Sequence, residues 1–427
     1  MTLPEGWRSS TIGAEAKFLS GGTPSKENSS FWGGKFPWVS ARDMKALYLR
    51  STLLGLTDAG RTASAVAPAN SVLVLTRGMT LLKDLPVCFI EREMAFNQDI
   101  KALLPKGSLD ARFLAYQLLA RKNEILDLVD TAGHGTGRLD TDLLKDVAFS
   151  VPPVGEQARI ADALSTWDRA ISKAEQLLAN RRAQWQGLLA RCLNLPAANP
   201  DASSSADNVG FPPSVQPGIP NLPRAPDWWS RAPLGHHLTE VRRPAPLNPN
   251  DAYRLVTVKR SRGGVELRET LTGRQIKTRT QFYVQTGDFL ISKRQIVHGA
   301  CGIVPAELDG AVVSNEYAVL NSDGQIDLRF LRYLSESRYF QQTCFHSSIG
   351  VHVEKMIFKT ERWLKWPFNI PPLPVQLRIV EVLDTARREV ELIAAQIDRL
   401  KQEKAALMAD LLTGKRRVSL PDAETTT

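Results

Sequence analysis

The sequence is poor in the features that mark secreted, membrane-spanning or zinc-binding proteins. Only 4 of its 427 residues are cysteine, and no two of them form a CxxC pair. No apolar run approaches the roughly 20 residues that a membrane-spanning helix needs. The start, Met1–Trp7, lacks the basic and then apolar segments of a secretory signal. These absences argue against disulfides, zinc ligation and a membrane partner, and they predict a cytoplasmic protein.

Motifs for catalysis are also missing. There is no GxxxxGK(S/T) phosphate loop, no HExxH and no Cys/His cluster with metal-ligand spacing. An adenine methyltransferase would need an Asn/Asp-Pro-Pro-Tyr/Phe motif, which Asn248–Asn250 does not match. Gly133–Gly137 is rich in glycine, but no clear strand precedes it, so we interpret it as a turn and not as a cofactor loop. We predict no catalytic, cofactor-binding or metal-binding residue; a standalone DNA methyltransferase or nuclease is the alternative.

The charge balance favours a polyanionic partner. The net charge is +9 and the isoelectric point about 9.4, as is typical of proteins that bind nucleic acid. Residues 1–153 contain 18 basic and 16 acidic residues, a net +2, whereas residues 227–372 contain 20 and 14, a net +6. Within the second range, Arg242–Arg294 contains 12 basic and 4 acidic residues. We predict a phosphate-facing surface there, with an ordinary solvated surface as the alternative.

The chain also contains an internal repeat. Five blocks recur in the same order with offsets of 216 to 222 residues; for example, Leu109–Tyr116 corresponds to Ile326–Tyr333. Each half has short alternating apolar runs that predict strands, amphipathic segments at 109–128 and 328–344 that predict helices, and then a long helical segment. The predicted fold class is α+β, with two similar globular domains related by a pseudo-two-fold repeat.

Proline and heptad patterns set the predicted boundaries. Residues 194–226 contain 8 prolines and few large apolar residues, which predicts a semi-extended linker. The predicted order is a first globular domain (1–153), a first helix (154–193), the linker (194–226), a second globular domain (227–372), a second helix (373–414) and a basic, then flexible tail (415–427).

Both long helical segments place apolar residues at alternating spacings of four and three, the pattern of a coiled coil. We predict that the two helices pack antiparallel on each other and, at ~1.5 Å per residue, separate the domains by roughly 50 Å. The alternative is that each helix packs only on its own domain. The predicted helix–helix seam consists of Ile160, Leu164, Trp167, Ile171, Leu178, Trp185, Leu188, Ile379, Leu383, Val390, Ile393, Ile397, Leu400, Leu407 and Leu411.

Two domains held at a set distance would suit a divided target on double-stranded DNA, which advances ~34–36 Å per turn. Such a target has two short half-sites around an unread spacer. Because the halves of the chain differ in sequence, the target should be asymmetric. A coiled-coil scaffold that binds other proteins without reading sequence is the alternative.

The repeated element Pro-Pro-x-x-x-Gln-x-Arg-Ile opens both helical segments, and the second segment closes with Asp410–Val418. In this combination the chain resembles the DNA-specificity subunits of type I restriction-modification systems. The resemblance implies two target-recognition domains and an antiparallel coiled coil. It also implies assembly with two methyltransferase (modification) subunits and with restriction/translocase subunits. Adenine N6 methylation, and the S-adenosylmethionine, ATP and magnesium that the complex uses, would belong to those partners.

Two differences between the copies of the repeat bear on the resemblance and on the predicted contacts. Glu156 precedes Gln157 in the first copy, as the family favours, whereas Val375 precedes Gln376 in the second. The first domain has Gly133–Leu139 where the second has Gly350–Met356, so a contact made by one domain need not recur in the other.

Candidate DNA contacts are basic residues for phosphates and Arg, Lys, Asn, Gln or His for base edges. Asn97 also has a structural alternative, as a turn cap, and Trp32, Trp38, Trp228 and Trp229 are expected to pack in cores rather than on bases. The candidates are Lys26, Lys35, Arg42, Lys45, Arg77, Lys83, Asn97, Gln98, His134 and Arg138 in the first domain, and Arg242, Arg243, Lys259, Arg260, Arg262, Arg274, Lys277, Arg279, Lys293, Arg294, Gln295 and His298 in the second.

Overall fold

The computed structural model describes residues 3–132, 135–193 and 211–418. The chain divides into two compact units, Met1–Gln176 with Ala394–Thr427 and Leu177–Ile393. Each unit contains one globular head and a segment of each of two long helices, α6 (Val154–Cys192) and α10 (Leu373–Leu412). We call residues 3–153 the first head and residues 211–372 the second head.

The first head is built on two sheets. The larger has the strand order β2 (Ala16–Ser20), β11 (Ile100–Pro105), β7 (Ser71–Leu75), β9 (Val87–Ile90), β4 (Tyr48–Leu49). The other has the order β5 (Leu54–Leu56), β3 (Trp32–Val39), β10 (Met94–Phe96), β6 (Val66–Ala67). All five residues of β7 are buried, because this strand lies inside its sheet and has apolar neighbours on both faces.

Smaller elements complete the first head. Strand β1 (Arg8–Thr11) pairs with β14 (Ala148–Val151), and β12 (Val129–Ala132), β13 (Thr136–Leu139) and β8 (Arg77–Gly78) form a three-stranded sheet. The helices are α1 (Ile12–Glu15), η1 (Ser29–Phe31), α2 (Asp58–Thr62), η2 (Met79–Leu82), α3 (Ala111–Ala120), α4 (Lys122–Leu126) and α5 (Thr141–Asp146).

The second head repeats this plan with different details. One of its two larger sheets has the strand order β16 (Leu238–Glu240), β23 (Tyr317–Ser322), β20 (Phe289–Ser292), β21 (Cys301–Ile303). The other has the order β18 (Val265–Thr272), β17 (Ala252–Val258), β22 (Val312–Ser314), β19 (Gln281–Tyr283). Strand β15 (Ser230–Pro233) pairs with β26 (Pro367–Ile370), and β24 (Ser348–Ile349) with β25 (Ile357–Phe358). The helices are η5 (Leu234–His236), η6 (Ile296–His298), η7 (Ala306–Leu308), α7 (Leu328–Leu334), α8 (Arg338–His346), η8 (Val353–Lys355) and α9 (Thr360–Trp363).

The predicted amphipathic helices at 109–128 and 328–344 are each divided in two. In the first head, α3 ends before Arg121 and α4 begins after it; in the second, Ser337 caps α8 after α7 has ended. Asp110 and Asp327 cap α3 and α7, since each side chain accepts a hydrogen bond from the backbone of the first turn. The periodic pattern predicted the helical content, whereas local capping places the breaks.

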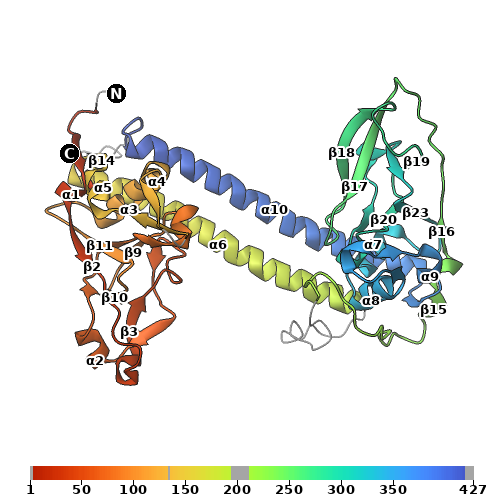
Figure 1. Ribbon diagram of the computed structural model, residues 1–427, viewed down its shortest axis with the longest axis horizontal. Helices are drawn as coiled ribbons and strands as arrows, with labels where there is room; N and C mark the ends of the chain where they lie inside the picture. The colour runs from red at the N-terminus through yellow and green to blue at the C-terminus, as the bar shows by residue number, and fades with distance from the viewer. Residues whose placement is uncertain (1–2, 133–134, 194–210, 419–427) are drawn as a thin grey trace, which may run out of the picture. The chain divides into compact units, whose positions relative to one another are not determined.

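Within each unit, α6 and α10 lie side by side and antiparallel (Figure 1). In the first unit, Asp168 pairs with Lys404 and Glu175 with Lys401, so that residue numbers rise along one helix as they fall along the other. In the second unit, Arg181 of α6 lies 3.7 Å from Glu389 of α10. Every residue of the predicted helix–helix seam is buried or partly buried. The two helices therefore pack on each other as well as on the heads.

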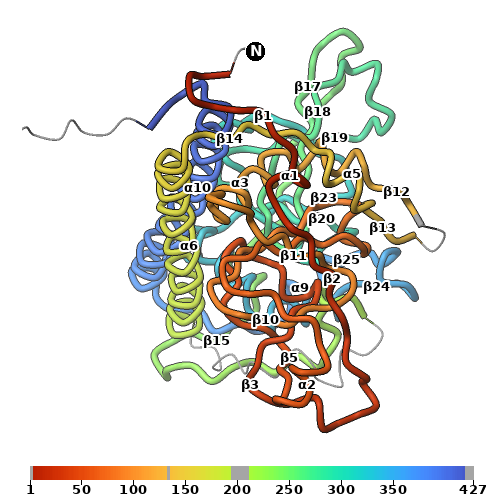
Figure 2. Tube along the Cα trace, turned by 90° about the vertical axis from the view of Figure 1, so that its left-hand side faces the viewer, coloured from red at the N-terminus to blue at the C-terminus, as the bar shows by residue number. Residues whose placement is uncertain are grey.

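Both heads have cores that continue into both helices. Ile160 and Leu164 of α6 and Leu411 of α10 belong to the core of the first unit, and Figure 2 shows α3 beside these helices. Leu189 of α6 and Leu383 of α10 belong to the core of the second unit. Helix and head are thus joined by continuous apolar packing.

The described part of the linker, residues 211–226, has no helix or strand. It is nevertheless packed against the second head, because Val215 is fully buried and Ser214 lies 2.8 Å from the Nδ1 atom of His298. Asn369 also donates a hydrogen bond to the carbonyl of Pro223. This part of the proline-rich segment therefore packs on the second head and is not only a spacer.

Candidate nucleic-acid interface and its junctions with the helices

The glutamine of the repeated Pro-Pro-x-x-x-Gln element joins each head to its helix. Gln157 is buried in the first turn of α6; its amide donates to the Pro152 carbonyl and its carbonyl accepts from the backbone of Asp110. Gln376 does the same at the start of α10, with Pro371 and Asp327. A glutamine suits this place because one side chain supplies both a donor and an acceptor. The repeated element is thus a structural junction and not a ligand site.

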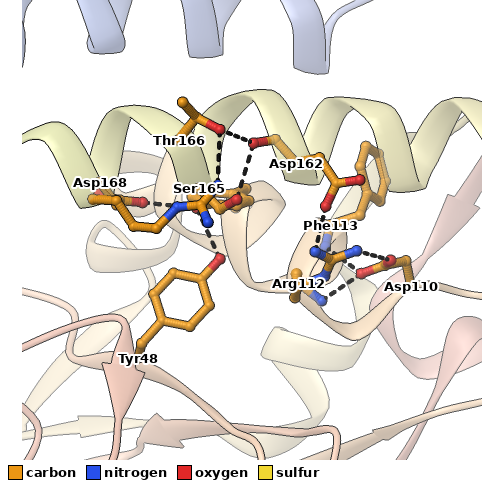
Figure 3. Close-up of polar contacts among 10 residues, drawn as sticks. Tyr48, Asp110, Arg112, Phe113, Asp162, Ser165, Thr166 and Asp168 are labelled. Carbon is orange, nitrogen blue, oxygen red and sulfur yellow. Dashed lines mark hydrogen bonds and ion pairs between the residues drawn. The ribbon is translucent and has the colours of Figure 1, made fainter.

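A charged junction lies next to the first glutamine. The guanidinium of Arg112 on α3 is shared between Asp110, the cap of that helix, and Asp162 on α6 (Figure 3). The second head keeps only part of this arrangement, since Arg329 binds its own cap, Asp327, at 2.6 Å. The forked geometry of arginine allows this double contact, which lysine cannot reproduce.

A tyrosine on each head donates a hydrogen bond to an aspartate on a long helix. Tyr116 donates to Asp168 at 2.7 Å, and Tyr333 donates to Asp384 at 2.5 Å. Burial raises the pKa of both hydroxyls, and the neighbouring carboxylate raises it further, so both remain donors. In the first unit Lys404 of α10 also binds Asp168, at 2.6 Å. The head, α6 and α10 therefore meet in one polar network.

The difference between Glu156 and Val375 has a structural reason. The carboxylate of Glu156 is almost fully buried, and it accepts hydrogen bonds from the indole of Trp7 and from Arg417, which follows α10. Burial alone would raise the pKa of Glu156, but the hydrogen bonds from Arg417 and Trp7 outweigh it and hold that pKa below its ordinary value. In the second unit the buried Trp229 Nε1 has no partner among the described residues. Glu156 on α6 therefore binds the segment that follows α10.

The basic candidates of the first head are exposed, apart from His134, which lies outside the described residues. No side-chain hydrogen bond or ion pair joins them to another described residue. They are Lys26, Lys35, Arg42, Lys45, Arg77, Lys83 and Arg138. Gln98 is exposed and accepts from Thr23, whereas Asn97 is buried and donates to the Asp99 carboxylate; its Oδ1 atom caps no turn among the described residues.

Most basic candidates of the second head have a polar partner within the protein, although only Arg243, Arg262 and Lys293 are partly buried. Arg243 forms a bidentate pair with buried Asp288, and Arg262 donates to the Ser335 carbonyl beside Glu336. Lys293 pairs with Glu240, which also lies 4.0 Å from Arg242. The remaining pairs are Lys259 with Glu266, Arg260 with Glu354 and Arg294 with Glu316, and Arg279 donates to the Gly273 carbonyl.

Few candidates of that stretch lack a partner among the described residues. Arg274 and Lys277 are exposed and have no side-chain partner among the described residues. Gln295 accepts a hydrogen bond from Arg260, and His298 is buried. A charge count over Arg242–Arg294 therefore overstates the basic surface that this stretch presents.

Sequence reasoning missed a second basic group around η8, β25 and α9. Lys355, Arg362 and Lys365 are exposed, Lys359 is partly exposed, and no ion pair to a described residue holds them. Residues 355–365 contain 4 basic residues and 1 acidic residue, a net +3. A count in short windows would have detected this group. The corresponding α5 of the first head has the opposite character, with Asp142 and Asp146.

The other expectations concern packing and metals. Trp38 is buried and meets Trp32 edge to face at 5.1 Å between ring centroids, as predicted for core tryptophans, whereas Trp228 is exposed. Among the described residues no group of three or more His, Cys, Asp or Glu could hold a metal ion. No helix in the described ranges is long and apolar enough to cross a membrane.

Comparison with known proteins shows which sequences and folds this chain resembles. The sequence profile of the type I restriction modification DNA specificity domain matches residues 4–180. The specificity subunit of the Escherichia coli type I restriction enzyme EcoR124I/EcoR124II is 30% identical over 161 residues, which are 37% of this chain and 40% of that subunit. The MjaIX specificity subunit of Methanocaldococcus jannaschii is 24% identical over 41% of this chain and 40% of the relative.

These two alignments span about two fifths of each relative. The MjaVIII specificity subunit of Methanocaldococcus jannaschii aligns more widely, with 20% identity over 98% of this chain and 95% of the relative. The solved S subunit of the M. genitalium type I restriction-modification system matches with a TM-score of 0.56 and 14% identity, covering 96% of this chain and 98% of that chain. A chain from a structure of a type I R-M system matches with a TM-score of 0.51 and 16% identity, covering 97% and 100%.

The structural matches confirm the predicted α+β fold with two long helices. The sequence matches show that residues 4–180 match the type I restriction modification DNA specificity domain and that the chain is similar to type I restriction enzyme specificity subunits.

Proposed function

We propose that this chain recognises an asymmetric, bipartite target on double-stranded DNA and performs no catalytic step itself. The observation that carries the proposal is that two heads of different surface chemistry are built into the same antiparallel helix pair through the same glutamine junction. The junctions repeat, whereas the charged surfaces do not. This is the pattern expected when a common frame holds two independent recognition surfaces.

The partners follow from the same proposal. The chain would position two methyltransferase subunits, which methylate adenine at N6, and restriction/translocase subunits on the bound target. S-adenosylmethionine, ATP and magnesium would be bound by those subunits. The complex would act on DNA in the cytoplasm, and the four cysteines, all of them free thiols, suit such a reducing compartment. No membrane is involved in this scheme.

Sequencing the adenine methylation of host DNA, with and without this chain, tests the proposal. A split motif should appear only when the chain is expressed together with a methyltransferase subunit. Substitutions confined to one head should alter one half of the motif and leave the other half unchanged. If both halves were always lost together, the heads would not be independent readers.

A second experiment separates this proposal from its alternatives. The purified chain, incubated with DNA and S-adenosylmethionine or with DNA and magnesium, should neither methylate nor cleave the DNA. Methylation or cleavage by the chain alone would identify it as an enzyme. Footprints that are the same on every DNA sequence, in the presence of bound partner proteins, would instead identify a scaffold.

A further inference from the structure

The small sheet of the first head brings two arginines directly opposite each other. Strand β13 lies between β12 and β8, and the register pairs Arg138 with Arg77 on one side and with Asp130 on the other. Residues opposite each other in a sheet have Cβ atoms about 5 Å apart and point to the same face. Arg77 and Arg138 are both exposed, so this face presents two neighbouring guanidinium groups to solvent.

This arrangement is unfavourable in the free protein. Like charges directly opposite in a sheet are destabilising. Asp130 is the one acidic residue in the same cross-strand row, and no ion pair joins it to either arginine within the described ranges. The sheet therefore keeps a repulsive pair whose charge is only partly offset by the protein itself.

The backbone holds the two arginines in place. The Leu139 amide donates to the Thr76 carbonyl and the Arg77 amide donates to the Asp99 carbonyl, so both strands are tied beside the pair. A side chain at Gly137 would come within 2.8 Å of Leu81 Cβ, which shows how closely β13 is packed on η2. The juxtaposition of Arg77 and Arg138 is thus a product of the fold and not of two long side chains meeting in solvent.

The second head does not repeat the pair. Lys293 occupies the position equivalent to Arg77 in the repeat, and its ammonium group is bound to Glu240 at 3.0 Å. Its carbonyl accepts from the backbone of Phe358, but Lys293 lies in a turn after β20 and its charge is paired. The arginine pair is therefore a property of the first head alone.

We propose that Arg77 and Arg138 together bind one phosphate of the DNA backbone. The inference rests on the proposed function and assigns one of its contacts. A phosphate accepts paired hydrogen bonds from forked guanidinium groups, and its negative charge would relieve the repulsion between them. The pair supplies affinity and register, and base readout belongs to other residues.

The test uses the purified full-length chain, alone and with a co-expressed methyltransferase subunit, on duplex DNA over a range of salt concentrations. Arg77→Ala and Arg138→Ala should each weaken binding by about tenfold at low salt. The double variant should lower the slope of log K against log salt by about 0.9, the value for one phosphate contact, and not by twice that amount. Lys17→Ala, which removes an exposed charge from β2 of the same head, is the matched control and should change neither quantity to this extent.

Two further measurements distinguish binding from a structural role. Both alanine variants should keep or slightly raise the melting temperature, because each removes a repulsive charge; a structural arginine would lower it. Arg77→Lys with Arg138→Lys should retain the salt slope but lose part of the affinity, because lysine keeps the charge and lacks the fork.

Other results would overturn the inference. Unchanged affinity and slope in the double variant, while the unmodified chain still directs methylation of a split motif, would refute the arginine site and leave the proposed function intact. Unchanged DNA binding with loss of the methyltransferase subunit would show that the pair binds an acidic protein surface. Failure of the unmodified chain to bind DNA under any condition would refute the proposed function itself.

Discussion

The ion pair between Lys404 and Asp168 should stabilise the first unit far more than a neighbouring pair of almost the same length. Lys404 Nζ lies 2.6 Å from Asp168, with 16% and 25% of the two side chains exposed. Lys401 lies 2.7 Å from Glu175 on the same two helices, with 53% and 50% exposed. Because distance and helix pair are matched, burial is the main variable that separates them.

The expected magnitudes follow from that burial. Replacing Lys404 by Met leaves the largely buried Asp168 carboxylate with the Tyr116 hydroxyl as its donor, which should cost about 2–3 kcal/mol of unfolding free energy, somewhat less than for a fully buried pair. Replacing Lys401 by Met should cost about 0.5 kcal/mol or less, because an exposed pair is screened by solvent. The double change Lys404→Met with Asp168→Leu should recover part of the loss, since the buried charge goes with its partner while the Tyr116 hydroxyl keeps only Tyr48 as a hydrogen-bond partner.

Urea unfolding of the full-length variants provides the measurement. Hydrogen exchange at α3 and α7 assigns any loss to the first or the second unit, which is needed because a chain with two units need not unfold in one step. Equal effects of Lys404→Met and Lys401→Met would show that burial does not control the strength of these pairs. Failure of the double variant to recover stability would show that Lys404 acts by packing and not by charge.

Three further predictions follow from the junctions and from the basic surface. Gln157→Ala should destabilise the first unit by about 1–3 kcal/mol, because the backbone N–H of Asp110 loses its acceptor. Gln376→Ala should destabilise the second unit in the same way through Asp327. Hydrogen exchange in each unit checks this selectivity, and an equal loss in both units would contradict it. The pKa of Glu156 is lowered in the folded state, so its carboxylate stabilises the protein fully above the ordinary pKa and loses this effect as pH falls through the lower, folded-state pKa. The difference in unfolding free energy between the unmodified chain and Glu156→Gln should therefore vanish in acid. A difference that persists at low pH would exclude the charge as its source. Lys359→Ala with Arg362→Ala should weaken DNA binding and reduce its salt slope by about 0.9 for each phosphate that the variant no longer neutralises, and an unchanged slope would show that this surface faces something else.

Several features of the fold were accessible from sequence because they depend on local periodicity. The repeat, the proline pairs and the heptads predicted two α+β halves and two long helices, and the comparisons confirm this fold. Helix breaks were less accessible. The interruptions at Arg121 and at Ser337 depend on capping and on packing against other elements, which no periodic pattern contains.

The candidate surface was harder to predict than the fold. Arg243 and Arg77 are both basic candidates in the sequence, but Arg243 is paired with buried Asp288, 45 residues away, while Arg77 remains exposed beside Arg138. A count of charges cannot separate the two cases, because the partner of each charge is set by the register and packing of distant strands. A count in short windows detects the group at 355–365, but only the structure shows that no ion pair to a described residue neutralises its basic side chains.

The amino-acid sequence alone determined which segments could be strands or helices and that the chain carries two related halves, since those properties arise from neighbours within a few turns or strands. Only the tertiary structure decided what the repeated glutamines bind, why Glu156 differs from Val375, and which arginines face solvent. Those outcomes rest on pairs such as Lys404 with Asp168, which lie 236 residues apart and meet only after two helices have packed. Hydrogen bonds and ion pairs act over a few ångströms, so their partners are chosen by the folded chain and not by proximity in sequence.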